Sequence, residues 1–219
     1  MVAEDTRERI LDAAEHLFSE RGFDGTSIRD VTAEAAVNLA AVHYHFGSKE
    51  DLLRAVLERI VLPTNIERLR LMEEAYAEPG GPLIADLLRA FILPELRLAR
   101  DLGPRGQCIT RLIGRMFSEP NEVVHQLAAD LFSEVGGCLI QGLQQALPDL
   151  PEEEVAFRMQ CVVGVFTFFM ADTVPSPWKL IDLNDPEGAT ERLVTFLEPA
   201  LSAPATVLPQ RKGGVDIPA

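Results

Sequence analysis

The sequence predicts an all-α protein, in which a three-helix helix-turn-helix head at the N-terminus is joined by a long bent helix to a larger helical domain. Apolar residues recur at spacings of three and four along successive segments, which is the period of one face of an α-helix. Serine, asparagine, proline and glycine residues separate these segments where helices begin and end. No stretch has the alternating pattern of a β-strand.

The composition is that of an ordinary folded protein. Of 219 residues, 47% are hydrophobic and 25% are charged. The first residues lack the layout of a signal peptide, and no uninterrupted apolar run reaches membrane-spanning length. Three well-separated cysteines, Cys108, Cys138 and Cys161, argue against a disulfide framework or a thiolate zinc site. We expect a soluble cytoplasmic protein with no cofactor and no membrane partner.

The net charge of −14 is unusual for a nucleic-acid-binding protein, because most such proteins are basic. Acidic side chains outnumber basic ones even within residues 1–60. If DNA is bound, the positive charge must therefore be arranged locally, with few phosphate contacts per subunit and an affinity that falls with salt.

The head is predicted from its helix caps. A first helix over 5–21 ends at Gly22, which can close a helix in the left-handed conformation. Ser27 precedes Asp30 by three residues and predicts a second helix that begins at residue 26 or 27. Asn38 can cap a third helix, with Val42 and Phe46 facing inward. Two short helices around a tight turn form a helix-turn-helix, whose second helix enters the major groove of DNA.

A fourth helix begins at Lys49 after a cap at Ser48, and Pro63 should kink or break it. We place the domain boundary there, with a DNA-binding domain over 1–60, a ligand-binding and dimerisation domain over 61–202 and a disordered tail over 203–219. A loop is expected over 173–185. The further helices of the larger domain are expected at 82–100, 105–118, 120–146, 151–172 and 186–202.

The segments TSIRDV, AAV and VHYHFGSKEDLL within residues 26–53 resemble the head of the TetR family of bacterial transcriptional regulators, and the resemblance covers residues 7–60. It implies a homodimeric repressor that a small hydrophobic effector, acyl or fatty-acid-like, releases from a palindromic DNA operator. The head residues that it implies at the DNA are Thr26, Ser27, Arg29, Leu39, Ala40, Ala41, His43, Tyr44, His45 and Lys49.

Two features depart from the family pattern. Ala36 stands where the turn favours glycine, and the run from Leu39 to Ala41 offers few long donors for base edges. Specificity would then rest on Arg29, on apolar contact with thymine methyl groups and on DNA shape. These features leave open an alternative, a helical interaction protein that has lost DNA binding. An enzyme is not expected, because no nucleophile, phosphate-loop or zinc-protease motif is present.

The larger domain has candidate residues for a pocket and for an interface. An apolar pocket with an arginine for an anionic group would use Phe91, Arg111, Arg115, Phe132, Phe166, Phe169 and Met170. A dimer interface on the last two helices would use Val162, Val163, Phe166, Leu193 and Leu197. The alternative for both sets is an internal core, with the arginine heads reaching water.

Overall fold

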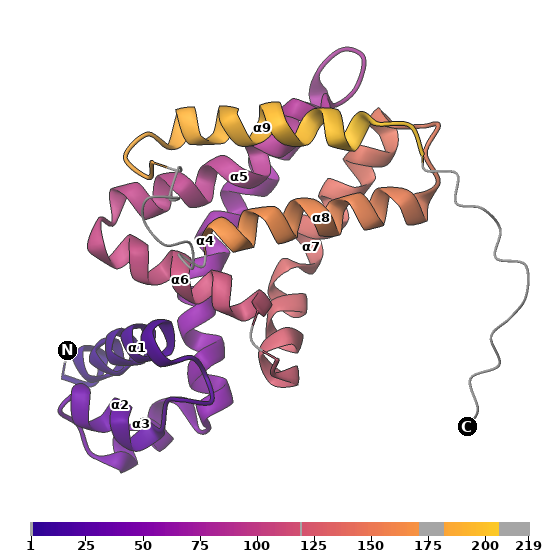
Figure 1. Ribbon diagram of the computed structural model, residues 1–219. Coiled ribbons are helices and arrows are strands. Elements are labelled where there is room, and N and C mark those ends of the chain that lie inside the picture. The colour runs from indigo at the N-terminus through magenta and orange to yellow at the C-terminus, as the bar shows by residue number, and fades with distance from the viewer. Residues whose placement is uncertain (1, 119, 171–181, 206–219) are drawn as a thin grey trace, which may run out of the picture.

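The computed structural model describes residues 2–118, 120–170 and 182–205, and within them the chain is helical without strands (Figure 1). A small head lies at one end, and α4 runs from it into a larger bundle. The helices are α1 (Val2–Arg21), α2 (Ile28–Glu34), α3 (Leu39–Phe46), α4 (Lys49–Ala77), α5 (Ile84–Asp101), α6 (Pro104–Ser118), α7 (Glu122–Ala146), α8 (Glu152–Met170) and α9 (Pro186–Ser202).

The predicted helix starts in the head are confirmed. The Ser27 hydroxyl accepts a hydrogen bond from the Asp30 amide at 3.2 Å, and the Ser48 hydroxyl accepts one from the Asp51 amide at 3.0 Å. The Asn38 side chain accepts from the amide three residues later at 2.8 Å. Each cap satisfies a backbone N–H that has no partner within its own helix, so these starts depend on local sequence alone.

Helix α4 continues through Pro63 as one helix, so the break that proline allowed does not occur. Pro63 has no N–H for the carbonyl of Arg59. The hydroxyl of Thr64 donates to the next carbonyl, that of Ile60, at 3.2 Å. A continuous α4 connects the head directly to the interior of the bundle.

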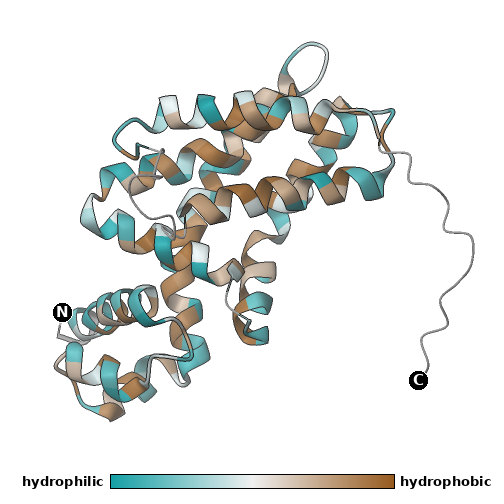
Figure 2. Ribbon diagram, in the orientation of Figure 1, coloured by the Kyte–Doolittle hydropathy of each residue, from teal (hydrophilic) through white to brown (hydrophobic). Residues whose placement is uncertain are grey.

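Two hydrophobic cores lie along the molecule, and hydrophobic residues gather in the middle of the larger bundle (Figure 2). The first core joins the head helices and the start of α4 to α6 and the start of α7, through residues that include Ile109, Leu112 and Val124. The second joins the rest of α4 to α5, α7, α8 and α9. The head therefore shares its core with body helices, which fixes its position on the bundle.

Helix α7 is long and apolar enough to cross a membrane by length and composition alone. A core helix passes the same test, and this one is interrupted by Asp130 and Glu134. Its buried residues Leu139 and Leu143 belong to the second core. The predicted loop at 173–185 and the predicted tail at 203–219 lie largely outside the described residues, at 171–181 and 206–219.

Candidate nucleic-acid interface

Helix α3 presents one face to solvent and buries the other. Val42 and Phe46 are buried in the first core, as their helical phase predicts. The opposite side exposes Leu39, His43 and Tyr44, and Tyr44 is 84% exposed. A short helix held by two buried anchors, with small and aromatic side chains outside, has the shape of an element that lies in the major groove.

The turn before α3 is held by a residue that the sequence analysis did not single out. Ala36 has a φ of 52°, a left-handed conformation that disfavours every residue with a Cβ. The guanidinium of Arg9, on α1, donates to the carbonyls of Ala35 and Ala36, the second at 2.9 Å. Arg9 thus satisfies carbonyls at the end of α2 and fixes the angle between the two helices of the motif.

Arg29 and Lys49 lie on the helices before and after α3, and His43 lies on α3 itself. Arg29 is exposed in the first turn of α2. Lys49 is the first residue of α4, and its ammonium lies 4.1 Å from the centroid of the Phe23 ring, which holds it near the positive end of the helix. The imidazole Nδ1 of His43 lies 2.8 Å from the carbonyl oxygen of Gly47, so this ring is fixed at the end of α3.

Thr26 was predicted to contact DNA, and this is wrong. Its side chain is 2% exposed, and its hydroxyl lies 2.8 Å from the carbonyl of Gly22 and 3.2 Å from that of Leu17. The residue closes the end of α1. Ser27 remains exposed, but its hydroxyl and its backbone N–H both donate to Asp30. Hydrogen bonds from Ser27 hold the pKa of Asp30 below its usual value.

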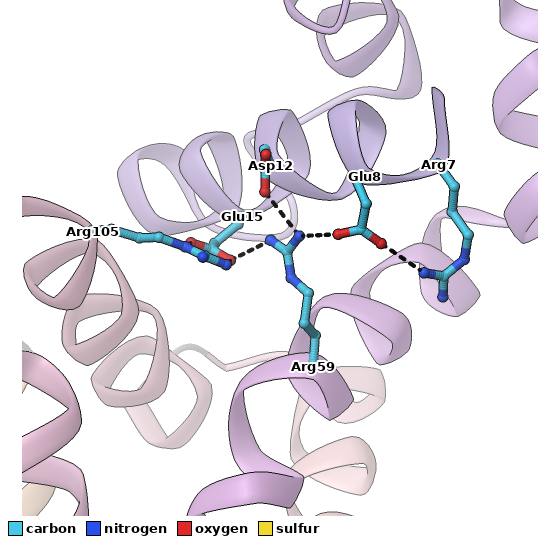
Figure 3. Close-up of polar contacts among 6 residues, drawn as sticks. All are labelled: Arg7, Glu8, Asp12, Glu15, Arg59 and Arg105. Atoms are coloured by element: carbon cyan, nitrogen blue, oxygen red, sulfur yellow. Dashed lines mark hydrogen bonds and ion pairs between the residues drawn. The ribbon is translucent and has the colours of Figure 1, made fainter. Parts of the chain in front are cut away.

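Three acidic side chains of α1 are engaged by arginines of α4 and α6 (Figure 3). Arg59, on α4, lies among Glu8, Asp12 and Glu15, with Nη1 at 3.1 Å and 2.8 Å from the first two. Arg105, on α6, binds both oxygens of Glu15 at 2.7 and 2.9 Å. We call these five residues the head–body ion cluster. Three carboxylates of α1 are therefore paired with arginines where α1 meets the bundle, and Arg105 comes from outside residues 1–60.

Arg111 and Arg115, which were predicted to line a ligand pocket, lie at the contact between α6 and the head. Arg111 forms an ion pair with the Glu20 carboxylate, and Arg115 Nη2 donates to the Glu20 carbonyl at 3.2 Å. Both arginines lie on the face of α6 that contacts the end of α1. Their spacing of one helical turn, which suggested a shared site for an anion, instead serves the contact with the head.

The buried ion pair of the bundle was missed by the sequence analysis. Arg68, on α4, and Glu95, on α5, are each 1% exposed, and Arg68 Nη2 donates to Glu95 Oε2 at 3.1 Å. The guanidinium lies between the rings of Phe91 and Phe132. Helical phase could have indicated Arg68, because Thr64 and Met72, one turn to either side, are also buried.

The other residues predicted to line a ligand pocket do not gather at one place. Phe91, Phe166 and Met170 are buried in the second core, with the first two rings 5.7 Å apart. Phe132 is partly buried and packs against the first core. Phe169 is exposed at the end of α8, so it lies outside the aromatic group around Arg68.

The residues predicted for the dimer interface belong to the core of the single chain, so that prediction is wrong in its detail. Val162, Phe166, Leu193 and Leu197 are buried by other helices of the same chain, and Val163 is partly buried against them. The exposed aromatic residues of α8 and α9 are different ones: Phe157 (59%), Phe168 (57%), Phe169 (38%) and Phe196 (66%). Helical phase alone did not distinguish the inner face from the outer one.

Two family models match the chain. Residues 10–56 match "Bacterial regulatory proteins, tetR family", and residues 89–199 match "Tetracyclin repressor-like, C-terminal domain". The first covers the head and the second covers most of the bundle from α5 to α9.

Curated relatives match over part of their length. The transcriptional repressor Rv3405c of Mycobacterium tuberculosis is 47% identical over 101 residues, which is 43% of this chain and 53% of that protein. The regulator AcrR of Shigella flexneri is 38% identical over 94 residues, which is 43% of this chain and 41% of that protein. The matches thus span about half the length of these relatives, which are named transcriptional regulators and repressors.

Solved structures share the fold over nearly the whole chain. The hemolysin II regulator HlyIIR superposes with a TM-score of 0.59 at 20% identity, covering 92% of this chain and 99% of that one. The fatty acid degradation regulator FadR of Bacillus halodurans superposes with a TM-score of 0.60 at 17% identity, covering 86% and 94%. With two family models spanning head and bundle, this chain belongs to the TetR family of bacterial regulatory proteins.

Proposed function

We propose that this chain is a homodimeric transcriptional repressor. Its two heads bind successive major grooves of a palindromic operator, and a small hydrophobic effector in the bundle releases them. The observation that carries the proposal is the exposed face of α3, held by buried Val42 and Phe46 behind it and by Arg9 at the turn. Such a regulator works in the cytoplasm, where its operator lies.

The proposed DNA contacts are divided by chemistry. Arg29 and Lys49 supply charge to phosphates, Lys49 with help from the N-terminus of α4. Leu39 and Ala40 are exposed and apolar, which suits thymine methyl groups. Because α3 has few long donors, shape readout of the operator is part of the proposal. The full set is Ser27, Arg29, Leu39, Ala40, Ala41, His43, Tyr44, His45 and Lys49.

Dimerisation is proposed through the outer faces of α8 and α9. Phe157, Cys161 and Phe168 lie along one face of α8 and are exposed, as is Phe196 on α9. Exposed aromatic side chains on two packed helices favour a four-helix bundle with a second copy across a two-fold axis. Two heads about 34–36 Å apart, one turn of DNA, then read the two halves of a palindrome.

Release by an effector requires a route from bundle to head. Helix α4 supplies one as a continuous helix that carries Lys49 at one end and Arg68 in the second core. Helix α6 supplies another, because Arg105 and Arg111 both reach α1. The effector must bind the DNA-incompetent arrangement more tightly, since differential affinity alone shifts the equilibrium. An acyl effector remains a proposal from the family resemblance.

The test is binding of the full chain to the DNA upstream of its own gene, measured by fluorescence anisotropy across a salt series. We expect a sequence-selective complex that weakens as salt rises. If no fragment is preferred over a shuffled duplex at any salt concentration, the alternative of an interaction protein is favoured. That alternative drew on the acidic head, and its force is reduced because Arg105 and Arg111, which lie outside residues 1–60, engage Glu15 and Glu20.

A further inference from the structure

The buried pair of Arg68 and Glu95 is unequally satisfied. Arg68 uses each of its nitrogens: Nε donates to the carbonyl of Phe91 at 2.9 Å, Nη1 to the side chain of Asn65 at 2.9 Å, and Nη2 to Glu95 at 3.1 Å. Glu95 accepts that last bond through Oε2. Its other oxygen, Oε1, is inaccessible to solvent and has no hydrogen-bond partner among the described residues.

A buried carboxylate oxygen without a donor is unfavourable, and native proteins usually provide one from the protein, from water or from a ligand. The pKa of Glu95 is raised by burial, while Arg68 opposes that shift. Protonation of Oε1 would not satisfy the site fully, because the new O–H would itself need an acceptor. A ligand that donates a hydrogen bond to Oε1 would therefore gain more binding free energy than one that donates to an atom already satisfied.

Aromatic rings lie between the surface and the Arg68 guanidinium. The Arg68 guanidinium lies 5.2 Å from the ring centroid of Phe91 and 5.7 Å from that of Phe132. The Phe132 ring lies 5.5 Å from the ring of Phe117, which is at the end of α6 and 37% exposed. Phe132, which is partly buried, is thus in contact with both the exposed Phe117 and the buried pair.

We propose that Arg68 and Glu95 form the polar floor of the effector site, and that this site selects an uncharged hydrophobic molecule carrying a hydroxyl or amide N–H. The pair is already balanced in charge. An anion would place a second negative charge beside Glu95, and a cation would leave an excess positive charge in the core, both unfavourable in a buried site. A neutral donor satisfies Oε1 and leaves the balance unchanged, so this site excludes a free fatty-acid anion and narrows the acyl class proposed above to uncharged molecules.

The site also has a connection to the head, and here the inference rests on the proposed function. Asn65, which accepts from Arg68, donates to the carbonyl of Leu131 on α7 at 2.8 Å. Arg68 and Asn65 both lie on α4, so a ligand at Glu95 acts on the contacts that fix α4 against α5 and α7. Occupation of the site would move the helix that begins at Lys49.

The experiment compares three probes with the same alkyl chain, 1-decanol, decanoate and decylamine, by titration calorimetry on the full chain. We expect decanol to bind at least about tenfold more tightly than either charged probe. In the double variant Arg68→Met, Glu95→Leu, which replaces a buried pair with apolar residues and tends to preserve folding, this preference should disappear. The control variant Arg111→Met should keep it.

A single substitution, Glu95→Gln, provides an independent check. It removes the negative charge and leaves that of Arg68, so decanoate should gain at least about tenfold relative to decanol. Equal binding of the three probes to the wild type, a wild-type preference for decanoate, or an unchanged preference in the double variant would each overturn the site. Operator binding is measured separately without probe. If decanol binds with the predicted preference but leaves the operator complex intact, the proposed release by an effector is wrong. The proposed ligand site at Arg68 and Glu95 is then retained.

Discussion

Arg105 of α6 binds Glu15 of α1 through both carboxylate oxygens, with its Nε and Nη2 at 2.7 and 2.9 Å. Arg59 of α4 reaches the same carboxylate from the other side (Figure 3). Glu15 is thus bound by one arginine of α4 and one of α6. A shift of either helix changes the contacts of α1, which gives the head–body ion cluster a direct influence on the position of the head.

This cluster predicts a pH dependence of stability. Burial raises the pKa of Glu15, but hydrogen bonds and charge from Arg105 and Arg59 outweigh it and leave the pKa below 4.5, its ordinary value. The stabilisation is therefore present above about pH 4.5 and is lost as the pH falls through the folded-state pKa. Glu15→Gln should lower the free energy of unfolding by about 1.5–3 kcal/mol at neutral pH, as measured by urea denaturation.

The difference between wild type and Glu15→Gln should narrow at about pH 4 and below, because glutamine does not titrate. Glu67→Gln is the matched control: Glu67 forms a surface pair with Arg70 and should change stability by less than about 1 kcal/mol. An equal loss from Glu15→Gln at neutral and acidic pH would contradict the role given to its charge.

The turn at Ala36 predicts a stabilising substitution. An L-residue with a Cβ in the left-handed region is strained by about 1–2 kcal/mol, and glycine removes that strain while adding some entropy to the unfolded chain. Ala36→Gly should therefore raise the free energy of unfolding by about 1 kcal/mol. Ala33→Gly, an exposed position within α2, should lower it by roughly 0.5–1 kcal/mol. Both are measured by chemical denaturation, and a loss from Ala36→Gly would disprove the strain.

The exposed face of α8 predicts the effect of a charge on assembly. Phe157→Asp should place a carboxylate within the proposed dimer interface and shift the chain toward monomer, seen by sedimentation equilibrium. Ile66→Asp is the control, since Ile66 is also an exposed apolar residue and lies on α4. This substitution should leave the assembly unchanged. A dimer that persists in Phe157→Asp but dissociates in Ile66→Asp would move the interface to α4.

The helix starts of the head could be predicted because each depends on residues three apart in the sequence. Ser27 with Asp30, and Ser48 with Asp51, form reciprocal caps in isolation from the rest of the fold. The inward phase of Val42 and Phe46 was predictable for the same reason. Ala36 was identified as the unusual turn residue, and its positive φ confirms that the backbone there is left-handed.

The failed predictions required knowledge of which helix covers which face. Thr26 and Arg111 have polar side chains suited to DNA or a ligand, but the Thr26 hydroxyl donates to Leu17 and Gly22 at the end of α1, and Arg111 pairs with Glu20 of α1. Leu193 and Phe166 have a helical phase that fits either a partner chain or the chain's own core. Glu95 lies among apolar residues, and only the approach of α4 to α5 shows why a carboxylate is placed there.

Arg29 predicts a change in DNA affinity without a change in folding. If it contacts a phosphate, Arg29→Ala should weaken operator binding by about tenfold and reduce the slope of log affinity against log salt by about 1. Arg70→Ala is the control, because Arg70 lies in the second half of α4 and pairs with Glu67 and Glu74. An unchanged salt slope in Arg29→Ala would show that Arg29 does not contact a phosphate.

The most direct test of the account is selection of duplexes from a random pool by the full chain, followed by anisotropy titration of the recovered sequence against its shuffled control. The account predicts a palindrome with half-sites about one helical turn apart, bound at least about a thousandfold more tightly than the shuffled duplex. It also predicts that this preference falls when Tyr44 and Leu39 are both replaced by alanine. Equal affinity for selected and shuffled duplexes would contradict it.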